Sequence, residues 1–229
     1  MNAYKLFNGD CNELLPRIIS TTNKPVIVSD PPFNVGYHFN QYKDSMPDKE
    51  YWETMTRIFS GCPCVVIHYP EALYKLCLCL GKVPSKVVSW VYPSNTGKQH
   101  RDIAFFDVNP DFRKVRQPYK NPNDKRIKAR IAEGHEGGRL YDWWEINQVK
   151  NVSKEKTKHP CQMPLEVMDR IIGILPNDVT IIDPFMGSGT TGVSAVKAGQ
   201  RFIGIEMDSV YFEIAERRIS NAISEQSLF

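Results

Sequence analysis

The chain has 229 residues, of which 41% are hydrophobic and 24% charged, and its formal net charge is +3. These values are typical of a soluble, globular protein with one substantial domain. No apolar run reaches the roughly 18 residues that a transmembrane helix needs, so we expect no membrane partner. The six cysteines are scattered and their C-x-C pairs lack the usual metal-site spacing, which favours reduced thiols, a cytoplasmic location and no bound metal.

Short apolar runs predict buried strands, and helical patterns lie between them. The predicted strands are residues 26–28, 65–67, 87–91, 179–182 and 202–205, and the predicted helices are 48–59, 164–174, 188–199 and 209–223. Continuous apolar runs are typical of a sheet that is covered on both faces. Strands that alternate with helices predict an α/β fold with a mainly parallel, doubly wound sheet.

The middle of the chain, residues 93–158, has a different character. It is polar, weakly periodic and rich in Pro, Asn and Gly, so we expect an insertion of extended loops with little core of its own. Between residues 95 and 130 it has ten Lys or Arg and four Asp, a net charge of +6. A basic stretch with interspersed aromatic residues is typical of a phosphate-contacting loop, although a solvated surface loop can have the same composition.

The first strong motif, Asp30-Pro31-Pro32-Phe33, follows the predicted strand 26–28. The prolines fix φ and remove two backbone donors, so the turn presents acceptors beside a flat aromatic ring. Two acceptors can take both hydrogens of a planar amino group while the ring stacks on the base. A turn that only ends a strand could have the same sequence, so this motif alone leaves both interpretations open.

The second motif, Asp183-Pro184-Phe185-Met186-Gly187-Ser188-Gly189-Thr190-Thr191, lies between a predicted strand and a predicted helix. Its glycines let the backbone approach a nucleotide-like ligand, and Asp183 stands where ligands of open α/β sheets bind. Glu206 ends the next strand, where an acidic residue can accept hydrogen bonds from the hydroxyls of a ribose.

Two other nucleotide-binding motifs, the P-loop and the dinucleotide fingerprint, also have glycine-rich loops between a strand and a helix. A P-loop requires a lysine after the glycines, and none is present. The spacing of Gly187, Gly189 and Gly192 formally matches the dinucleotide fingerprint, so the glycines alone leave an NAD-dependent oxidoreductase open. Asp183 just before the loop would repel a pyrophosphate, but it suits a cationic or zwitterionic ligand such as the methionine part of S-adenosylmethionine.

Together the two motifs resemble those of the amino-methylating DNA methyltransferases, which modify N6 of adenine or N4 of cytosine. The tetrad at residues 30–33 resembles the catalytic D/N/S-P-P-Y/F/W motif, and residues 183–191 resemble the cofactor motif D-P-F-x-G-S-G-T-T. The catalytic motif comes first, an order similar to that of the β group. Phe33 stands where tyrosine is commoner, and Met163 stands where the family often has lysine.

The resemblance implies a Rossmann-like class I methyltransferase fold with a loop-rich target-recognition insertion. It divides the chain into a catalytic half (residues 1–92), the target-recognition insertion (93–158) and a cofactor-binding half (159–229). Asn8-Gly9-Asp10-Cys11 resembles the start of the group, and Lys158-His159-Pro160-Cys161-Gln162-Met163-Pro164 resembles the segment before the cofactor strand.

The resemblance also assigns roles to residues. Catalysis falls to the tetrad Asp30, Pro31, Pro32 and Phe33. S-adenosylmethionine is the implied cofactor, held by Asp10, Cys11, Asp30, His159, Pro160, Asp183, Pro184, Phe185, Gly187, Ser188, Gly189, Thr190, Thr191, Glu206 and Met207. The basic residues expected to contact DNA are Lys98, Arg101, Arg113, Lys114, Arg116, Lys120, Lys125 and Arg126.

The implied reaction is direct transfer of a methyl group to the exocyclic amino group of adenine in double-stranded DNA. Aspartate at the first tetrad position favours adenine over cytosine, because cytosine-N4 enzymes of this group more often have serine there. The alternatives are a cytosine-N4 DNA methyltransferase, an RNA or protein amide methyltransferase, an NAD-dependent oxidoreductase and a DNA-binding protein with a decayed site. A homodimer and a cognate restriction endonuclease are further expected partners.

Four bulky residues have a structural and a functional interpretation. Trp90, Trp143 and Trp144 could each stack on a base, but we expect core packing for them. His68 could line the pocket, but we expect a structural histidine with satisfied ring nitrogens.

Overall fold

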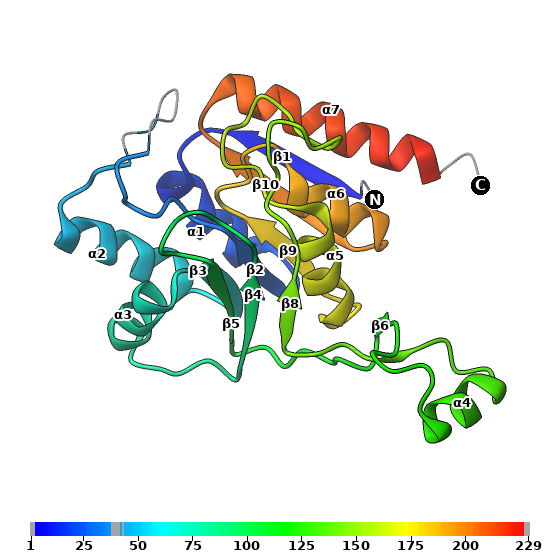
Figure 1. The fold of residues 1–229 in the computed structure, drawn as a ribbon. Helices are drawn as coiled ribbons and strands as arrows, with labels where there is room; N and C mark the ends of the chain where they lie inside the picture. Colours follow the sequence, from blue (N-terminus) through cyan, green and yellow to red (C-terminus); the bar gives the residue numbers. More distant parts are fainter. Residues whose placement is uncertain (1–2, 38–41, 43, 227–229) are drawn as a thin grey trace.

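The computed structural model describes residues 3–37, 42 and 44–226. A sheet of eight strands in the order β1-β10-β9-β2-β3-β5-β4-β8 forms its centre (Figure 1). The strands are β1 (Tyr4–Asn8), β2 (Pro25–Ser29), β3 (Cys64–His68), β4 (Lys86–Val91), β5 (His100–Phe106), β8 (Trp143–Glu145), β9 (Thr180–Asp183) and β10 (Arg201–Glu206). The five strands from β1 to β3 in this order are parallel, so the predicted α/β class is confirmed.

Helices cover both faces of this sheet. On one face lie α1 (Cys11–Thr21), α2 (Asp48–Phe59) and α3 (Pro70–Leu80), and on the other lie α5 (Leu165–Ile174), α6 (Thr190–Lys197) and α7 (Ser209–Gln226). Val26 and Val28 of β2 pack on the α5–α7 side, whereas Ile27 between them packs on the α1–α3 side. This alternation between two cores explains why the strands have continuous apolar sequences.

The insertion differs from the expected run of extended loops. Strand β5 lies inside residues 93–158, yet it pairs antiparallel with both β3 and β4, and its Ile103 and Phe105 are fully buried. Strand β8 completes the sheet beside β4 and buries Trp144. Loops were expected because the apolar part of β5 is short and follows polar residues; long-range pairing with β3 and β4 decides its conformation.

The rest of the insertion forms an arm outside the sheet. It contains a two-stranded ribbon of β6 (Arg116–Gln117) and β7 (Gly138–Arg139) and the helix α4 (Lys125–Ala132). Figure 1 shows α4 far from the helical layers, and none of its residues is buried. Here the expectation of a segment with little core of its own is confirmed.

The burial of the tryptophans and the length of the helices test two further expectations. Trp90 is buried, as expected, and its indole Nε1 donates to the Ile146 carbonyl at 2.7 Å. The expectation of core packing is wrong for Trp143, which is 43% exposed. Within the described ranges, no helix combines the length and apolarity that crossing a membrane would require.

The position of β5 in the core gives a stability prediction. Phe105→Ala should lower the free energy of unfolding by about 3–5 kcal/mol, because it leaves a cavity between β3, β4 and the helices behind them. Tyr74→Ala on α3, where the side chain is 67% exposed, is the matched control and should change it by about 0.5 kcal/mol or less. Urea titration followed by circular dichroism measures both; equal losses would contradict the assigned core.

Candidate active site

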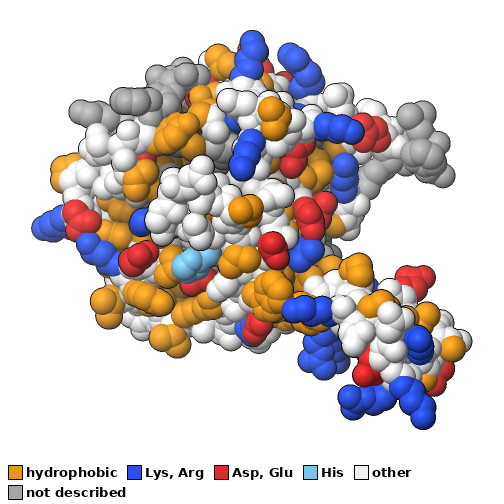
Figure 2. All heavy atoms as spheres, in the orientation of Figure 1, with side chains coloured by type: hydrophobic (Ala, Val, Ile, Leu, Met, Phe, Trp, Pro, Cys, Tyr) orange, Lys and Arg blue, Asp and Glu red, His pale blue; other side chains and the backbone are white. Residues whose placement is uncertain are grey.

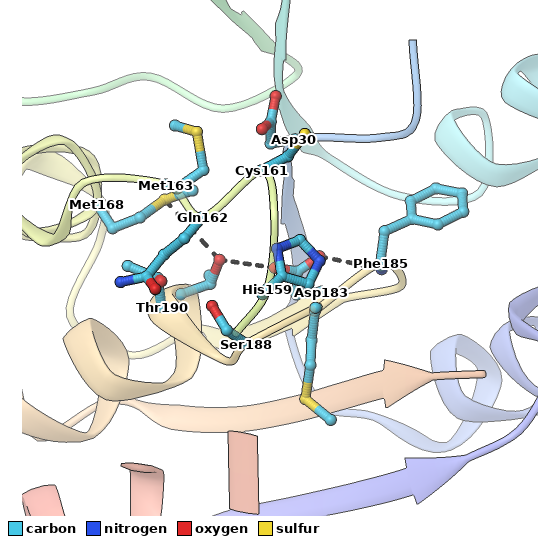
Figure 3. A pocket seen from close by; sticks show the side chains of 13 residues that line it. Asp30, His159, Cys161, Gln162, Met163, Met168, Asp183, Phe185, Ser188 and Thr190 are labelled. Atoms are coloured by element: carbon cyan, nitrogen blue, oxygen red, sulfur yellow. Dashed lines mark hydrogen bonds between the residues drawn. The ribbon is translucent and has the colours of Figure 1, made fainter. Parts of the chain in front are cut away.

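The carboxyl ends of β2 and β9 meet at one edge of the sheet. These strands are parallel neighbours, and the Ser29 hydroxyl at the end of β2 donates to Asp183 Oδ1 at the end of β9 over 2.7 Å. A cavity opens there, at the edge where open α/β sheets bind their ligands. It is lined by Asp30, His159, Cys161, Gln162, Met163, Met168, Asp183, Phe185, Met186, Gly187, Ser188, Thr190 and Thr191 (Figure 3).

The glycine loop between β9 and α6 has a backbone that side chains would disturb. Gly187 and Gly189 have φ values of +51° and +79°, which favour glycine. A Cβ atom on Gly187 would lie 2.8 Å from His159 Nε2. The Gly187 and Asp208 amides each donate to one carboxylate oxygen of Glu206, both at 2.8 Å. Glu206 therefore fixes the loop and still has lone pairs for another donor.

Arg218 of α7 also holds this loop, although it is not among the residues predicted from the sequence. Its Nη1 donates to the Ser188 carbonyl at 2.6 Å and approaches the hydroxyls of Ser188 and Thr190 at 3.0 and 3.1 Å. No sequence signal points to Arg218, because it lies on an ordinary amphipathic helix and its role depends on how α7 packs against α6.

Asp183 is a buried carboxylate inside the site. It accepts hydrogen bonds from the hydroxyls of Ser29 and Thr191 and from the Phe185 amide. Burial raises its pKa to about 6, because the loss of hydration outweighs these three donors. Above this pH the edge of the sheet carries a negative charge that suits a cationic ligand.

The tetrad forms a rigid turn directly after β2. The Tyr51 hydroxyl donates to the Pro32 carbonyl at 2.7 Å, and the Phe33 ring stacks on His68 with the ring centroids 4.1 Å apart. The Asp30 side chain is 13% exposed. Burial raises its pKa to about 6; Arg101 lowers this pKa and Asp183 raises it. Asp30 is thus a desolvated acceptor that is mostly ionised at neutral pH.

His68 supports the aromatic member of the tetrad. Its Nδ1 accepts a hydrogen bond from the Tyr69 amide at 2.8 Å, so a neutral ring carries its hydrogen on Nε2, which lies 3.1 Å from the Tyr51 hydroxyl. Burial lowers the pKa of His68 to about 3, so the ring stays neutral. The expected satisfied histidine is confirmed, and its ring also packs against Phe33 of the tetrad.

Arg101 is one of the residues expected to contact DNA, but it lies in the interior beside the tetrad and not on an exposed loop. Its side chain is only 14% exposed, its Nη1 lies 3.3 Å from Asp30 Oδ2, and its guanidinium carbon lies 4.7 Å from the centroid of Phe33. The cause is the position of β5 inside the sheet, which directs this side chain toward the end of β2.

The other predicted DNA contacts lie in three places. Lys98 is exposed, and its Nζ lies 4.0 Å from the centroid of Tyr69 beside the site. Lys114 is held against the main body, where it donates to the Leu175 carbonyl and to Asn177. The remaining five, Arg113, Arg116, Lys120, Lys125 and Arg126, are exposed along the arm, whose basic side chains are visible in Figure 2.

The arm also has a hollow of about 270 Å³ with basic walls. Arg113, Arg116, Arg130 and Arg139 line it, together with the two glycines of β7 and its approach. Arg130 and Arg139 were not among the predicted contacts; Arg139 comes to Arg116 only through the pairing of β6 with β7.

Several predicted cofactor residues lie outside the cavity lining. Asp10 is the N-cap of α1, where it accepts a hydrogen bond from the Asn12 amide at 2.8 Å. Cys11, the first residue of α1, is 7% exposed in the core, and burial raises its pKa to about 12. Met207 is 41% exposed. Pro160, Pro184 and Gly189 adjoin lining residues without lining the cavity themselves, and Glu206 acts through Gly187.

A family model described as DNA methylase matches residues 25–217 of the chain. The chain belongs to this DNA methylase family. The Type II methyltransferase M.BglII of Bacillus subtilis is 27% identical over 98% of this chain and 71% of its own length. The DNA adenine methyltransferase YhdJ of Escherichia coli (strain K12) is 24% identical over 96% of this chain and 84% of its own length.

Solved structures show the same fold. M1.HpyAVI in its complex with S-adenosylmethionine superposes with a TM-score of 0.59 at 21% identity, covering 94% of this chain and 99% of its own. The predicted class I methyltransferase fold is confirmed for this chain.

The geometry of the glycine loop gives a second prediction. Gly187→Ala should weaken binding of S-adenosylmethionine, the predicted cofactor, by about tenfold or more, because the new methyl group displaces His159 from the cavity wall. Gly199→Ala is the control: its φ is also positive, at +69°, but no atom lies within 4 Å of its Cβ position. Both variants should lose about 1–2 kcal/mol of stability.

Titration calorimetry with S-adenosylmethionine distinguishes the two variants. Wild-type affinity in Gly187→Ala, or an equal loss of affinity in both variants, would contradict the role assigned to this loop.

Proposed function

We propose that the chain methylates the exocyclic amino group of adenine in DNA, with S-adenosylmethionine as the methyl donor. The observation that carries this proposal is that Asp30 of the tetrad and Gly187 of the glycine loop line one cavity. Membership in the DNA methylase family supplies the substrate class and agrees with this arrangement.

The residues of the cavity fit S-adenosylmethionine. Gly187 lines the cavity, and because it has no side chain His159 can pack against the loop backbone and form the cavity wall. Asp30 and Asp183 supply negative charge for a sulfonium, and the unused lone pairs of Glu206 suit ribose hydroxyls. When bound, the cofactor would supply an electrophilic methyl group, with S-adenosylhomocysteine as the leaving group.

The chain's own contribution to the reaction is to hold and activate the amine. The lone pair of a base amino group is delocalised into the ring, so the nitrogen is a poor nucleophile. Hydrogen bonds from its two N–H groups to the Asp30 carboxylate and the Pro31 carbonyl draw the nitrogen toward tetrahedral geometry. The Pro32 carbonyl already accepts the Tyr51 hydroxyl, which keeps this turn in place. Phe33 provides the stacking surface for the extruded base.

Adenine is the favoured base for two reasons. The first tetrad residue is Asp30, which in the family that the motifs resemble accompanies adenine more often than cytosine. YhdJ, a relative across 96% of this chain, is a DNA adenine methyltransferase. Cytosine N4 is the second candidate, because it offers the same two N–H donors to the same acceptors.

Recognition of the DNA falls to the arm in this proposal. Its exposed arginines and lysines project away from the main body, and the hollow between Arg116, Arg130 and Arg139 suits a backbone phosphate. Double-stranded DNA as the form of the substrate, a homodimer, a cognate restriction endonuclease, a cytoplasmic location and the division at residues 92 and 158 stay predictions.

The direct test is methylation of unmethylated genomic DNA with radiolabelled S-adenosylmethionine, followed by nucleoside analysis and single-molecule mapping of the sites. We expect N6-methyladenine in one short sequence motif. N4-methylcytosine as the product would show that the target base is cytosine and not adenine. Label that appears in RNA or protein but not in DNA would contradict the proposal.

The tetrad gives a third prediction. Asp30→Asn should lower the rate of methyl transfer by about 100-fold or more, because an amide is a weaker acceptor and brings N–H groups of its own toward the amine. Binding of S-adenosylmethionine, measured by calorimetry, should weaken far less than the rate falls, because Asp183 and the glycine loop remain. A variant that retains the wild-type rate would show that Asp30 does not hold the amine.

The arm gives a fourth prediction. Arg116→Gln should weaken DNA binding at all sequences alike and reduce the slope of log K against log salt concentration by about 1, the loss of one phosphate contact. Arg57→Gln, an exposed site on α2, should leave this slope unchanged. Fluorescence anisotropy between low and moderate salt measures the slope, and an unchanged slope in Arg116→Gln would remove this contact from the interface.

A further inference from the structure

Arg101 lies in the space that a target base needs. A base that donates one amino hydrogen to Asp30 while it stacks on Phe33 must lie between that carboxylate and that ring. The Arg101 guanidinium is already there: Nη1 is 3.3 and 3.5 Å from the two Asp30 oxygens, and Cζ is 4.7 Å from the ring centroid of Phe33.

The guanidinium shares the recognition features of the amino group on a base. It is flat, it carries N–H donors at its edge, and it packs against aromatic rings. Arg101 uses all three features, since its Cζ also lies 5.4 Å from the Trp90 ring and 5.8 Å from the Tyr69 ring. The acceptor and the stacking surface that suit an amino base are therefore engaged by a side chain of similar chemistry.

This arrangement does not suit methyl transfer itself. Positive charge moves toward the amine nitrogen as its bond to the methyl group forms, and a guanidinium within hydrogen-bond distance of Asp30 opposes that charge and competes for the same oxygens. The side chain is also incompletely satisfied here: among the described residues, the buried Arg101 Nε has no acceptor. When Arg101 leaves this position, its Nε therefore loses no hydrogen bond.

We propose that Arg101 is the residue that the target base displaces, a side chain that occupies the base position and must leave Asp30 before the amine can bind. This inference rests on the proposed function, and it assigns Arg101 a role in base selection that differs from phosphate contact. A base enters only where its own contacts to Asp30 and Phe33 replace those of the guanidinium.

The charge environment of Asp30 makes the displacement measurable. The titratable groups that face it are Arg101 on β5, Asp183 on β9, Tyr51 on α2, Tyr92 after β4 and Cys161 in the segment before α5. Arg101 is the cation in this set and lowers the pKa of Asp30, whereas Asp183 raises it. Loss of Arg101 should therefore raise the pKa of Asp30 in each state of the enzyme in which Arg101 contacts Asp30.

The test compares Arg101→Met with the wild type over a range of pH. The pH dependence of kcat/KM for DNA reports groups in the enzyme before DNA binds, and the single-turnover rate at saturating DNA reports groups in the complex. We expect the acid limb of kcat/KM in the variant to move to higher pH by about 1 unit. The acid limb of the single-turnover rate should lie at the same pH in the variant and in the wild type. In the wild-type complex with DNA, Arg101 has already left Asp30, so its replacement no longer changes the pKa of Asp30.

Equal movement of both limbs would show that Arg101 stays on Asp30 during the reaction and would overturn the proposal. Movement of neither limb would overturn it too, because it would remove the contact in the free enzyme. Arg57→Met on α2 is the control for replacing one arginine by methionine, and neither limb should move. A wild type that methylates no DNA would instead overturn the proposed function.

A second readout does not depend on turnover. Once the methylated site is mapped, 2-aminopurine at the target position reports extrusion of the base by its fluorescence. At pH 8.5, Arg101→Met should show a larger fluorescence increase on saturating binding than the wild type, and an equal or smaller increase would contradict displacement. Should the methionine variant fail to fold, Arg101→Gln, which is uncharged but keeps a planar donor, takes its place with the same expected outcomes.

Discussion

Parallel pairing of β2 with β9 is the constraint on which the rest of the site depends. It sets Ile27 opposite Ile182, and the ends of the two strands are joined by the hydrogen bond from Ser29 to Asp183. Two motifs separated by about 150 residues of sequence are thereby fixed at one edge of a buried sheet. Because the backbone places Asp30 beside the glycine loop, the relative position of the amine-binding and cofactor-binding groups does not depend on a mobile segment.

Burial at this edge also determines the electrostatics of the site. Asp30 and Asp183 both have a pKa raised to about 6 by desolvation, and each resides next to hydrogen-bond donors or a cation that favour its ionised form. The cavity is consequently negative at neutral pH in a poorly hydrated setting, where charge interactions are strong. A cationic methyl donor suits this cavity better than a pyrophosphate does. The same burial gives Arg101 a strong influence, because its guanidinium acts directly on Asp30, the carboxylate that holds the amine in the proposed function.

The sequence predicts those parts of the structure that depend on local residue patterns. The strand 26–28 and the helix 48–59 have the expected apolar periodicity, and the two motifs follow strands because turn chemistry and strand ends lie together in the sequence. It does not predict β5, whose short apolar run becomes a central strand only through pairing with β3 and β4. Arg101 and Arg218 were misplaced or missed for the same reason: strand register and helix packing decide their contacts, and neither has a local signature.

In the proposed function, one cavity presents the methyl donor to an extruded adenine. The most direct measurement is a crystal structure of the chain with the cofactor analogue sinefungin and a DNA duplex that contains the mapped site. The account predicts the analogue against Gly187 and Asp183, with the target adenine out of the helix and its N6 within hydrogen-bond distance of Asp30. A target base that remains stacked in the duplex, or an analogue bound away from the glycine loop, would contradict it.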